Sequence, residues 1–425
     1  MDNINNQLKD VEFPEMIKIK QKFSNNHIPN PADYLYNKIT KSKLGLQINS
    51  GDNIAIPVGS RGIKMIVPML KQLISLVESH GGKPFIVPAM GSHGGATARG
   101  QLNILKKLGV SEETVGAPIH SSMDTVLLGY TDNGLPVYID EYVANADGII
   151  LFNRIKPHTS FRGKIESGLK KMLVIGVGKQ KGASICHKLG FEKMEENINY
   201  ISNKIIDSIN IIMAIGIIEN AYGEIYDIEV IKSKKINERE PQLLEIARSQ
   251  MSKILFSNID VLIIDEIGKD ISGTGMDTNI IGRYHTYVES HQPNINKIVV
   301  LDITEKSDGN ANGIGLADYT TQKVTDKISF EKMYMNAITS TVPKSVKVPM
   351  TLNNSKLAIA AAIKTSNLID ESKIRLIKIN NTSSLEEIYI SRPLISEVEK
   401  NDRLEKIGYS ENFRFDNKGE VINLK

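Results

Sequence analysis

Cysteine, histidine and aromatic residues are scarce in this sequence, and tryptophan is absent. Among 425 residues there are one cysteine, eight histidines and an aromatic content of 6%. The single cysteine, Cys186, excludes an internal disulfide bond. It also excludes a metal site or an iron–sulfur cluster that is built from several cysteines.

The sequence also lacks an excess of one charge and a long apolar run. The net charge is only +3 and the basic residues are spread along the chain, which argues against a nucleic-acid or membrane-surface binder. The longest apolar run, Ile211–Ile218, is too short to cross a bilayer. The first residues, MDNINNQLKDVEF, are polar and do not resemble a signal peptide. We therefore expect a soluble cytoplasmic protein.

What the chain does contain is an alternation of short apolar runs and amphipathic stretches. The runs Asn53–Val58 and Pro84–Pro88 are predicted strands, and the apolar spacing between them predicts a helix. An Asn-Gly turn predicts a hairpin within residues 126–139. Strands joined through helices imply parallel sheets, which bind ligands at the carboxyl ends of their strands. The predicted fold class is therefore α/β.

The length and the hydrophobic content of 41% predict more than one domain. We predict two α/β domains with largely parallel sheets, the first over residues 1–253 and the second over residues 254–385. Residues 386–425 form a C-terminal segment that could return to the first domain.

Three glycine-rich loops in the first half of the chain each follow a predicted strand. They are VGSRG, GSHGGAT and the segment 153–187, and their charged or titratable residues are Arg61, His93 and the set His158, Lys171 and His187. Glycines let backbone N–H groups approach a ligand closely, and a following helix N-terminus favours an anion. Arginine can clamp a carboxylate, and histidine can exchange a proton near neutral pH. The loops predict a site for an anionic ligand. The third segment, which contains a further apolar run at Met172–Val177, is interpreted as a crossing between two buried strands.

Each of these residues also has an ordinary interpretation. His93 could cap the helix that it precedes, and Lys170 and Lys171 could be surface charges at a helix start. His158 could be a hydrogen-bonded loop residue, and His187 could lie on the polar face of a helix.

Two further features, the stretch GVGKQKG and Cys186, do not indicate a nucleotide-binding loop or a thiol nucleophile. The stretch GVGKQKG resembles a phosphate loop, but Gln180 follows Lys179 where the nucleoside-triphosphatase motif needs Ser or Thr. Cys186 adjoins His187 without a recognisable triad, which disfavours a thiol nucleophile.

Taken in order, the motifs resemble the amino-terminal domain of the nickel-dependent lactate racemase family. VGSRG, PAMGSHGGAT, LGYTDNGLPVYID, ADGIILFNRIKPHTSF and SGLKKMLVIGVG follow one another over roughly residues 53–187, and a histidine comes after them. The resemblance implies a two-domain α/β enzyme with its active site in the cleft between the domains. The implied cofactor is the nickel-pincer nucleotide, a pyridinium mononucleotide that holds nickel through one carbon and two sulfurs.

The implied activity is racemisation or epimerisation of a 2-hydroxy acid. His93 and His158 match two acid/base histidines on opposite sides of the substrate. One takes the hydroxyl proton while a hydride leaves the α-carbon for the cofactor, and the hydride can then return to either face. A hydride acceptor fixed to the protein also agrees with the lack of a convincing dinucleotide-binding motif.

The resemblance also assigns the residues around the cofactor. Lys171 matches the lysine that carries the cofactor through a thioamide, because Gly176 follows it at the family's spacing, and Lys170 is its close competitor. His187 matches the protein ligand to nickel. Arg61 matches an arginine near the substrate carboxylate and is assigned with Gly168 to the cofactor-binding set. Cofactor-synthesising enzymes are implied as partners for loading.

The sequence also differs from the family. Val58 stands where the family has an aspartate, and the loops KDISGTGMD and GNANGIGLAD are unlike those of the lactate enzyme's second domain. The substrate is therefore not defined beyond a 2-hydroxy acid. Charge within glycine-rich loops gives four candidates for substrate contacts, although structural turns are the favoured reading for each: Lys269, Asp277, Arg283 and Asn310.

Two other classes of function stay open. One is a metal-dependent hydrolase or lyase on the same fold, which the lack of a tight cluster of His with Asp or Glu disfavours. The other is a small-acid binding protein without the cofactor, which would have no use for both Lys171 and His187.

Overall fold

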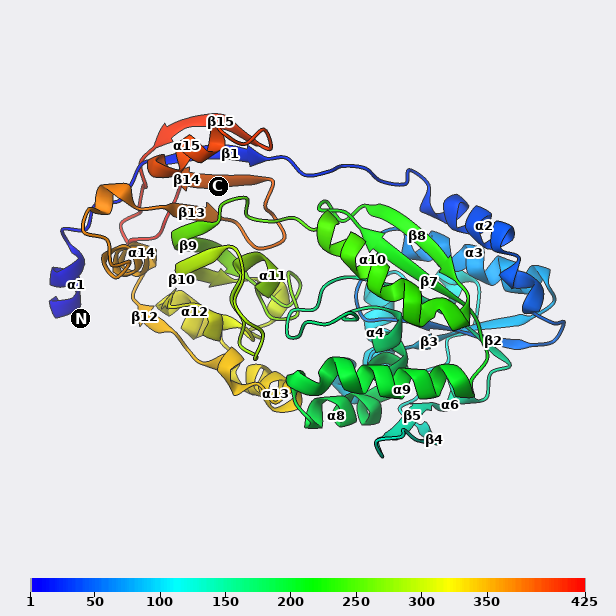
Figure 1. Cartoon of the computed structure of the whole chain (residues 1–425). Coiled ribbons are helices and arrows are strands. Elements are labelled where there is room, and N and C mark those ends of the chain that lie inside the picture. Colours follow the sequence, from blue (N-terminus) through cyan, green and yellow to red (C-terminus); the bar gives the residue numbers. More distant parts are fainter. Residues whose placement is uncertain (1, 425) are drawn as a thin grey trace. The chain divides into compact units, whose positions relative to one another are not determined.

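The computed structural model describes residues 2–424, which divide into two compact units (Figure 1). Residues 24–251 form one unit, called here the central unit. The described residues before position 24 and after position 251 form the other, called the terminal unit.

A five-stranded sheet organises the central unit. Its strands lie in the order β3-β2-β6-β7-β8, and only the β7–β8 pair is antiparallel. The bounds are β2 Asn53–Val58, β3 Lys83–Pro88, β6 Gly148–Arg154, β7 Ile211–Glu219 and β8 Ile225–Ile231. The strands are nearly continuous apolar runs because helices cover both faces of the sheet. The predicted strands at Asn53–Val58 and Pro84–Pro88 are confirmed.

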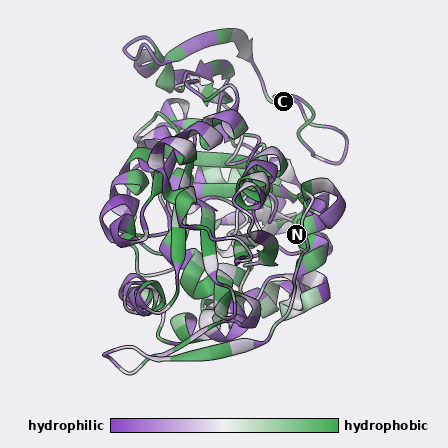
Figure 2. Cartoon of the chain, turned by 90° about the vertical axis from the view of Figure 1, so that its right-hand side faces the viewer, coloured by the Kyte–Doolittle hydropathy of each residue, from purple (hydrophilic) through white to green (hydrophobic). Residues whose placement is uncertain are grey.

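Helices pack on both faces of this sheet and create two cores. Alternate residues of β6 separate between them, with Ile150 and Phe152 in one core and Ile149 and Leu151 in the other. In Figure 2 the strands are largely green, whereas the helices around them carry both green and purple segments. The helices are α2 Pro31–Ser42, α3 Ile66–Ser79, α4 Ala98–Lys107, α5 Glu112–Val115, α6 Glu141–Ala144, α7 Leu169–Lys171, α8 Lys179–Lys188, α9 Met194–Ser208 and α10 Ile236–Gln250.

The predicted hairpin is present as a separate antiparallel pair. Its strands are β4 Thr125–Tyr130 and β5 Pro136–Asp140. The turn between them contains Gly134 with a φ of +81°, a conformation that suits glycine.

The apolar run Met172–Val177 is a π-helix that continues from α7, and not a strand. A short apolar run fits a buried helix as well as a buried strand, so its periodicity could not separate the two. Gly176 allows the π-helix to lie directly on the loop after β3, since a Cβ there would be 2.8 Å from the carbonyl oxygen of Ala89. The long helix of this region, α9, begins at Met194.

An eight-stranded sheet organises the terminal unit, in the order β12-β11-β10-β9-β13-β14-β1-β15. The first five strands are parallel, and the last three pair antiparallel. The strands are β1 Met16–Gln21, β9 Asn258–Ile267, β10 Asn294–Ile303, β11 Tyr319–Thr321, β12 Met350–Leu352, β13 Leu376–Ile379, β14 Glu387–Ser391 and β15 Leu404–Glu411. The helices are α1 Asp2–Leu8, α11 Thr278–Ile281, α12 Gln322–Lys327, α13 Phe330–Ser340, α14 Ser355–Lys364 and α15 Ile395–Val398.

The two ends of the chain meet in this second sheet. Strand β1 lies between β14 and β15, with Ile17 opposite Ile390 on one side and opposite Ser410 on the other. This differs from the predicted division, in which residues 1–253 formed one domain and residues 386–425 returned to it. Backbone pairing across nearly the whole length of the chain has no local signal in the sequence. The predicted class of two α/β bodies with largely parallel sheets is confirmed.

Among the described residues, no helix is both long enough and apolar enough to span a membrane.

Candidate active site

The segment after β6 is closed into a loop by an antiparallel bridge between Lys156 and Ser167. Within the loop, the buried carboxylate of Glu166 accepts hydrogen bonds from the backbone N–H groups of His158 (2.5 Å) and Gly163 (3.3 Å). Arg248 of α10 forms an ion pair with the same carboxylate. Charged hydrogen bonds of this kind are strong, so Glu166 fixes the backbone at His158.

The imidazole of His158 has one nitrogen engaged by its own loop. The backbone N–H of Ser160 donates to Nδ1 over 3.0 Å, so the neutral ring carries its proton on Nε2. Burial lowers the pKa of His158 well below its usual value, and the charges of Lys171 and His187 lower it further. His158 is therefore a neutral imidazole that can donate a proton from Nε2.

The two adjacent lysines of α7 have very different surroundings. The Lys170 ammonium is buried and donates to the side-chain oxygens of Asn199 (2.6 Å), Asn203 (3.2 Å) and Asn237 (2.6 Å). By contrast, no hydrogen bond or ion pair among the described residues engages the ammonium of Lys171. Lys171 is the lysine of the pair whose amine is available for another partner.

The amine of Lys171 is also easier to deprotonate than an ordinary lysine. Burial lowers the pKa of Lys171 to about 8, and the positive charges of Arg61 and Lys156 act in the same direction. Half of the amine is therefore neutral and nucleophilic near pH 8. The π-helix starts directly after Lys171, and such segments are frequent at functional sites.

His187 lies near the end of α8 and shares an aromatic neighbour with His158. The rings of His187 and His158 lie 5.3 Å and 6.2 Å from the ring of Phe191. Nδ1 of His187 is buried and has no hydrogen-bond partner among the described residues. Burial, aided by the charge of Lys171, lowers the pKa of His187 to about 4. A neutral imidazole with an unused nitrogen is suited to bind a metal ion.

The neighbouring thiol is a poor nucleophile. Burial raises the pKa of Cys186 to about 12, with only partial relief from the charge of Lys171. The low expectation for a thiol nucleophile agrees with this environment.

His93 lies in the loop between β3 and α4 and is exposed. Its Nδ1 lies 2.6 Å from Oγ of Ser60, which belongs to the loop after β2. Two residues before it, the backbone N–H of Gly91 donates to the carbonyl oxygen of Gly176 in the π-helix over 3.3 Å. His93 therefore does not act as a side-chain cap of the following helix, whose cap is Thr97.

Arg61 adjoins Ser60 and joins the same region. The surrounding protein and the charge of Arg154 lower the pKa of Arg61, although the side chain keeps contact with solvent. Arg61 lies close enough to Lys171 to lower the pKa of that lysine. The structure thus places four of the candidate residues in one electrostatic cluster, with His93 linked to it through Ser60: Arg61, His158, Lys171 and His187.

Gly168 has a packing role at the start of α7. Its carbonyl oxygen accepts a hydrogen bond from Nδ2 of Asn153 over 2.8 Å. A Cβ at this position would collide with the carboxylate of Glu240. That carboxylate accepts the backbone N–H of Lys170 over 3.0 Å, so the missing side chain lets Glu240 anchor α7.

Three residues of the site were missed in the sequence. Glu166 had one available signal, because it is a lone carboxylate in a basic loop. Ser60 and Phe191 had none, since their roles depend on contacts between segments that are distant in the chain.

The four candidates in the terminal unit mainly hold their own loops. Asp277 caps α11 by accepting the N–H of Asn279 (2.9 Å), and Nζ of Lys269 donates to the carbonyl oxygen of Gly273 (2.7 Å). Arg283 donates to Asp318 (2.8 Å). Asn310 donates to Oδ1 of Asn336 over 3.2 Å. These contacts favour a structural role for each residue over a role in binding substrate.

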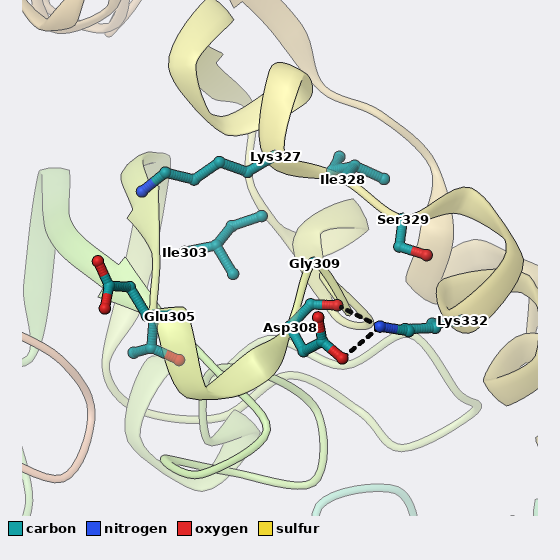
Figure 3. Close-up of a pocket in the computed structure, with 9 residues that line it drawn as sticks. Ile303, Glu305, Asp308, Gly309, Lys327, Ile328, Ser329 and Lys332 are labelled. Atoms are coloured by element: carbon teal, nitrogen blue, oxygen red, sulfur yellow. Dashed lines mark hydrogen bonds and ion pairs between the residues drawn. The ribbon is translucent and has the colours of Figure 1, made fainter.

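A pocket of the terminal unit lies beyond the end of β10, and Figure 3 shows Lys332 pointing to Asp308 inside it. Both of its lysines have carboxylate partners, because Lys332 pairs with Asp308 and Lys327 with Asp302 (2.5 Å). The pocket therefore offers no unbalanced charge for an anion, and none of the candidate residues of the central unit lines it.

Comparison with known proteins agrees with the resemblance noted in the sequence. Residues 17–199, a little under half of the chain, match the family model described as the lactate racemase N-terminal domain. The resemblance to the lactate racemase family is thereby confirmed for this part of the chain.

One solved structure shows limited similarity to this chain. The lactate racemase apoprotein from Thermoanaerobacterium thermosaccharolyticum is 14% identical, and the superposition covers 87% of this chain and 89% of that chain with a TM-score of 0.43. No curated protein matches the sequence.

Proposed function

We propose that this protein is a racemase or epimerase of a 2-hydroxy acid that uses a nickel-pincer nucleotide bound to Lys171. The observation that carries the proposal is the electrostatic cluster of Arg61, His158, Lys171 and His187 within a lactate racemase-like segment. A lysine amine without a partner, an imidazole with an unused nitrogen and an arginine at one place have little use in a protein that merely packs a core.

The residues of the cluster fit the proposed cofactor. The unengaged amine of Lys171 would carry it, and the unused nitrogen of His187 would provide the nickel ligand. No group of three or more His, Cys, Asp or Glu side chains among the described residues is arranged to hold a metal ion, so nickel would depend on ligands from the cofactor itself. When bound, the cofactor supplies an acceptor for the hydride of the α-carbon.

The histidines move the protons of the reaction. His158, with its proton on Nε2, would donate to an oxygen of the bound substrate. Nδ1 of His93 can donate to Oγ of Ser60, which leaves a lone pair on Nε2 to accept the hydroxyl proton. The roles exchange in the reverse direction, and Arg61 would orient the substrate carboxylate.

The test is a screen of single enantiomers of 2-hydroxy acids with protein that has been co-expressed with cofactor-synthesising enzymes. Chiral chromatography should show the opposite configuration appearing with one substrate class. His93→Ala and His158→Ala should each lower the rate by about 100-fold or more, because each removes an acid/base group. Lys181→Ala, an exposed lysine of α8, is the control and should retain the rate.

Other products would contradict the proposal. Cleaved or dehydrated products would favour a metal-dependent hydrolase or lyase. Tight binding of a small acid without turnover, by a protein that does not absorb visible light, would favour a binding protein.

A further inference from the structure

Lys179, in the GVGKQKG stretch, is a buried lysine that the proposed reaction leaves without a role. It begins α8 directly after the π-helix, with a left-handed φ of 54°, and its side chain is fully buried. Burial of an ammonium group is costly unless acceptors meet its three protons. Nζ of Lys179 lies 2.6 Å from the carbonyl oxygen of Pro88, 3.3 Å from Oε1 of Gln101 and 3.0 Å from Oδ2 of Asp140.

Gln101 extends this network to the backbone around His93. Its side chain is fully buried in α4, and Oε1 faces the ammonium of Lys179. The amide nitrogen therefore faces the other way, and it donates to the carbonyl oxygens of Gly91 (2.9 Å) and His93 (3.4 Å). One glutamine thus connects the buried lysine to both sides of the tight turn at residues 91–93.

The other partners tie the same turn to the end of β3 and to the separate hairpin of β4 and β5. Pro88 is the last residue of β3, directly before the loop that leads to His93, and Asp140 is the last residue of β5. On its opposite side, Gly91 donates to the π-helix at Gly176. The turn is therefore held between a buried ionic network and the backbone of the helix that follows Lys171.

We propose that Lys179 and Gln101 are positioning residues, which fix the backbone of His93 relative to the π-helix next to Lys171. They touch neither substrate nor cofactor in this account. The catalytic meaning of the network rests on the proposed function, because it assumes that His93 is an acid/base residue. The placement of the turn does not rest on the proposed function, and the position of the turn can be measured without any turnover.

The buried ion pair of Lys179 and Asp140 determines which substitutions can test the network. Burial lowers the pKa of Lys179 and raises the pKa of Asp140, so each group needs the other in order to stay charged. Removing one alone leaves an uncompensated buried charge and could unfold the protein. The informative variants are therefore Gln101→Leu and the neutral double variant Lys179→Met with Asp140→Asn.

The experiment follows the histidine Cε1–H signals of the full-length protein by NMR after ¹³C labelling of histidine, with His93→Gln assigning the signal of His93. In Gln101→Leu and in the double variant, the His93 signal should shift and should broaden or split, because the turn samples more than one arrangement. Gln101→Glu should behave like Gln101→Leu, since it can accept from Lys179 but cannot donate to the two carbonyl groups. Lys181→Met removes the same charge from an exposed site on α8 and should leave the signal unchanged.

An unchanged His93 signal in folded Gln101→Leu would overturn the proposal, and this single variant decides if the double variant fails to fold. In loaded enzyme, Gln101→Leu should lower kcat by about 10- to 100-fold with little change in KM, the loss expected from a displaced catalytic group. A fall in kcat without a change in the His93 signal would also contradict the proposal. If the signal changes as expected while the wild-type protein racemises no hydroxy acid, the proposed function fails and the positioning of the turn stands.

Discussion

At the scale of single residues, the candidate site differs from its surroundings in the polar groups of Lys171 and His187, which have no hydrogen-bond partner among the described residues. Lys170 and Lys171 are adjacent, and burial lowers the pKa of both to about 8. The family spacing favoured Lys171 but left Lys170 as a close competitor, because the sequence does not show that three asparagines surround only Lys170. The contacts, rather than the pKa values, single out Lys171.

The first prediction concerns the reactivity of these two lysines. Lys171 should be acetylated by a small anhydride with half-maximal labelling near pH 8, because burial stabilises its neutral amine. Lys170 should react much more slowly, since its ammonium is held by asparagine oxygens. Peptide mass spectrometry across a pH series would measure both, with exposed Lys181 as the reference. Faster labelling of Lys170 than of Lys171 would refute this assignment.

The second prediction concerns acid stability. The folded pKa of His187 is about 4, below its ordinary value of 6.5, so the unfolded chain binds more protons between these two pH values. Stability should therefore fall as the pH is lowered from 6.5 to 4, by about 3 kcal/mol from this group alone.

Urea unfolding at several pH values would measure this loss. His187→Gln should show a shallower fall than the wild type, whereas His27→Gln, at an exposed position, should show the same fall as the wild type. Equal slopes for all three proteins would show that His187 is not desolvated in the folded state.

At the scale of elements, local patterns predicted the sheet of the central unit better than the helices that surround its site. The strand Asn53–Val58 and the hairpin were readable because apolar runs, turn residues and alternation agree there. The conformation of Met172–Val177 could not be predicted, since five apolar residues and a glycine fit a buried helix as well as a buried strand. The candidate residues were found through their motifs, whereas their supports Glu166, Ser60 and Phe191 act through contacts between distant segments.

The third prediction tests the close approach of the His93 loop to the π-helix. Gly91 and Gly95 both have a left-handed φ, of 58° and 66°. A Cβ at Gly91 would lie 3.1 Å from the carbonyl oxygen of Ile175, whereas nothing lies within 4 Å of a Cβ at Gly95. Gly91→Ala should therefore lose more stability than Gly95→Ala, with the left-handed conformation costing each about 1 to 3 kcal/mol. Equal losses in urea unfolding would mean that the loop does not pack as described.

At the scale of the whole molecule, the two ends of the chain are built into one sheet. Strand β1 pairs with β14 and β15, so the terminal unit is completed by the first residues of the chain. Composition and periodicity could not assign the partners of β1, because pairing of strands so far apart depends on the assembled fold.

The fourth prediction separates the two units by their stability. Ile19 of β1 is fully buried, and Ile19→Ala should destabilise the terminal unit by about 2 to 5 kcal/mol through the cavity that it leaves. Hydrogen exchange should then rise in β14 and β15 and stay unchanged in β2 and β7. Lys20→Ala, at a solvent-facing neighbour, should change neither region by a comparable amount. Faster exchange in β2 and β7 instead would show that β1 stabilises the central unit.

The most direct test of the proposed function is the intact mass and nickel content of the protein after co-expression with cofactor-synthesising enzymes. We expect a stable mass increase and about one nickel per chain, which require the amine of Lys171 and the imidazole of His187. Lys171→Ala should abolish the mass increase, and Lys170→Met should retain it. An unmodified, nickel-free wild-type protein under those conditions would contradict the account, as would a mass increase that survives in Lys171→Ala.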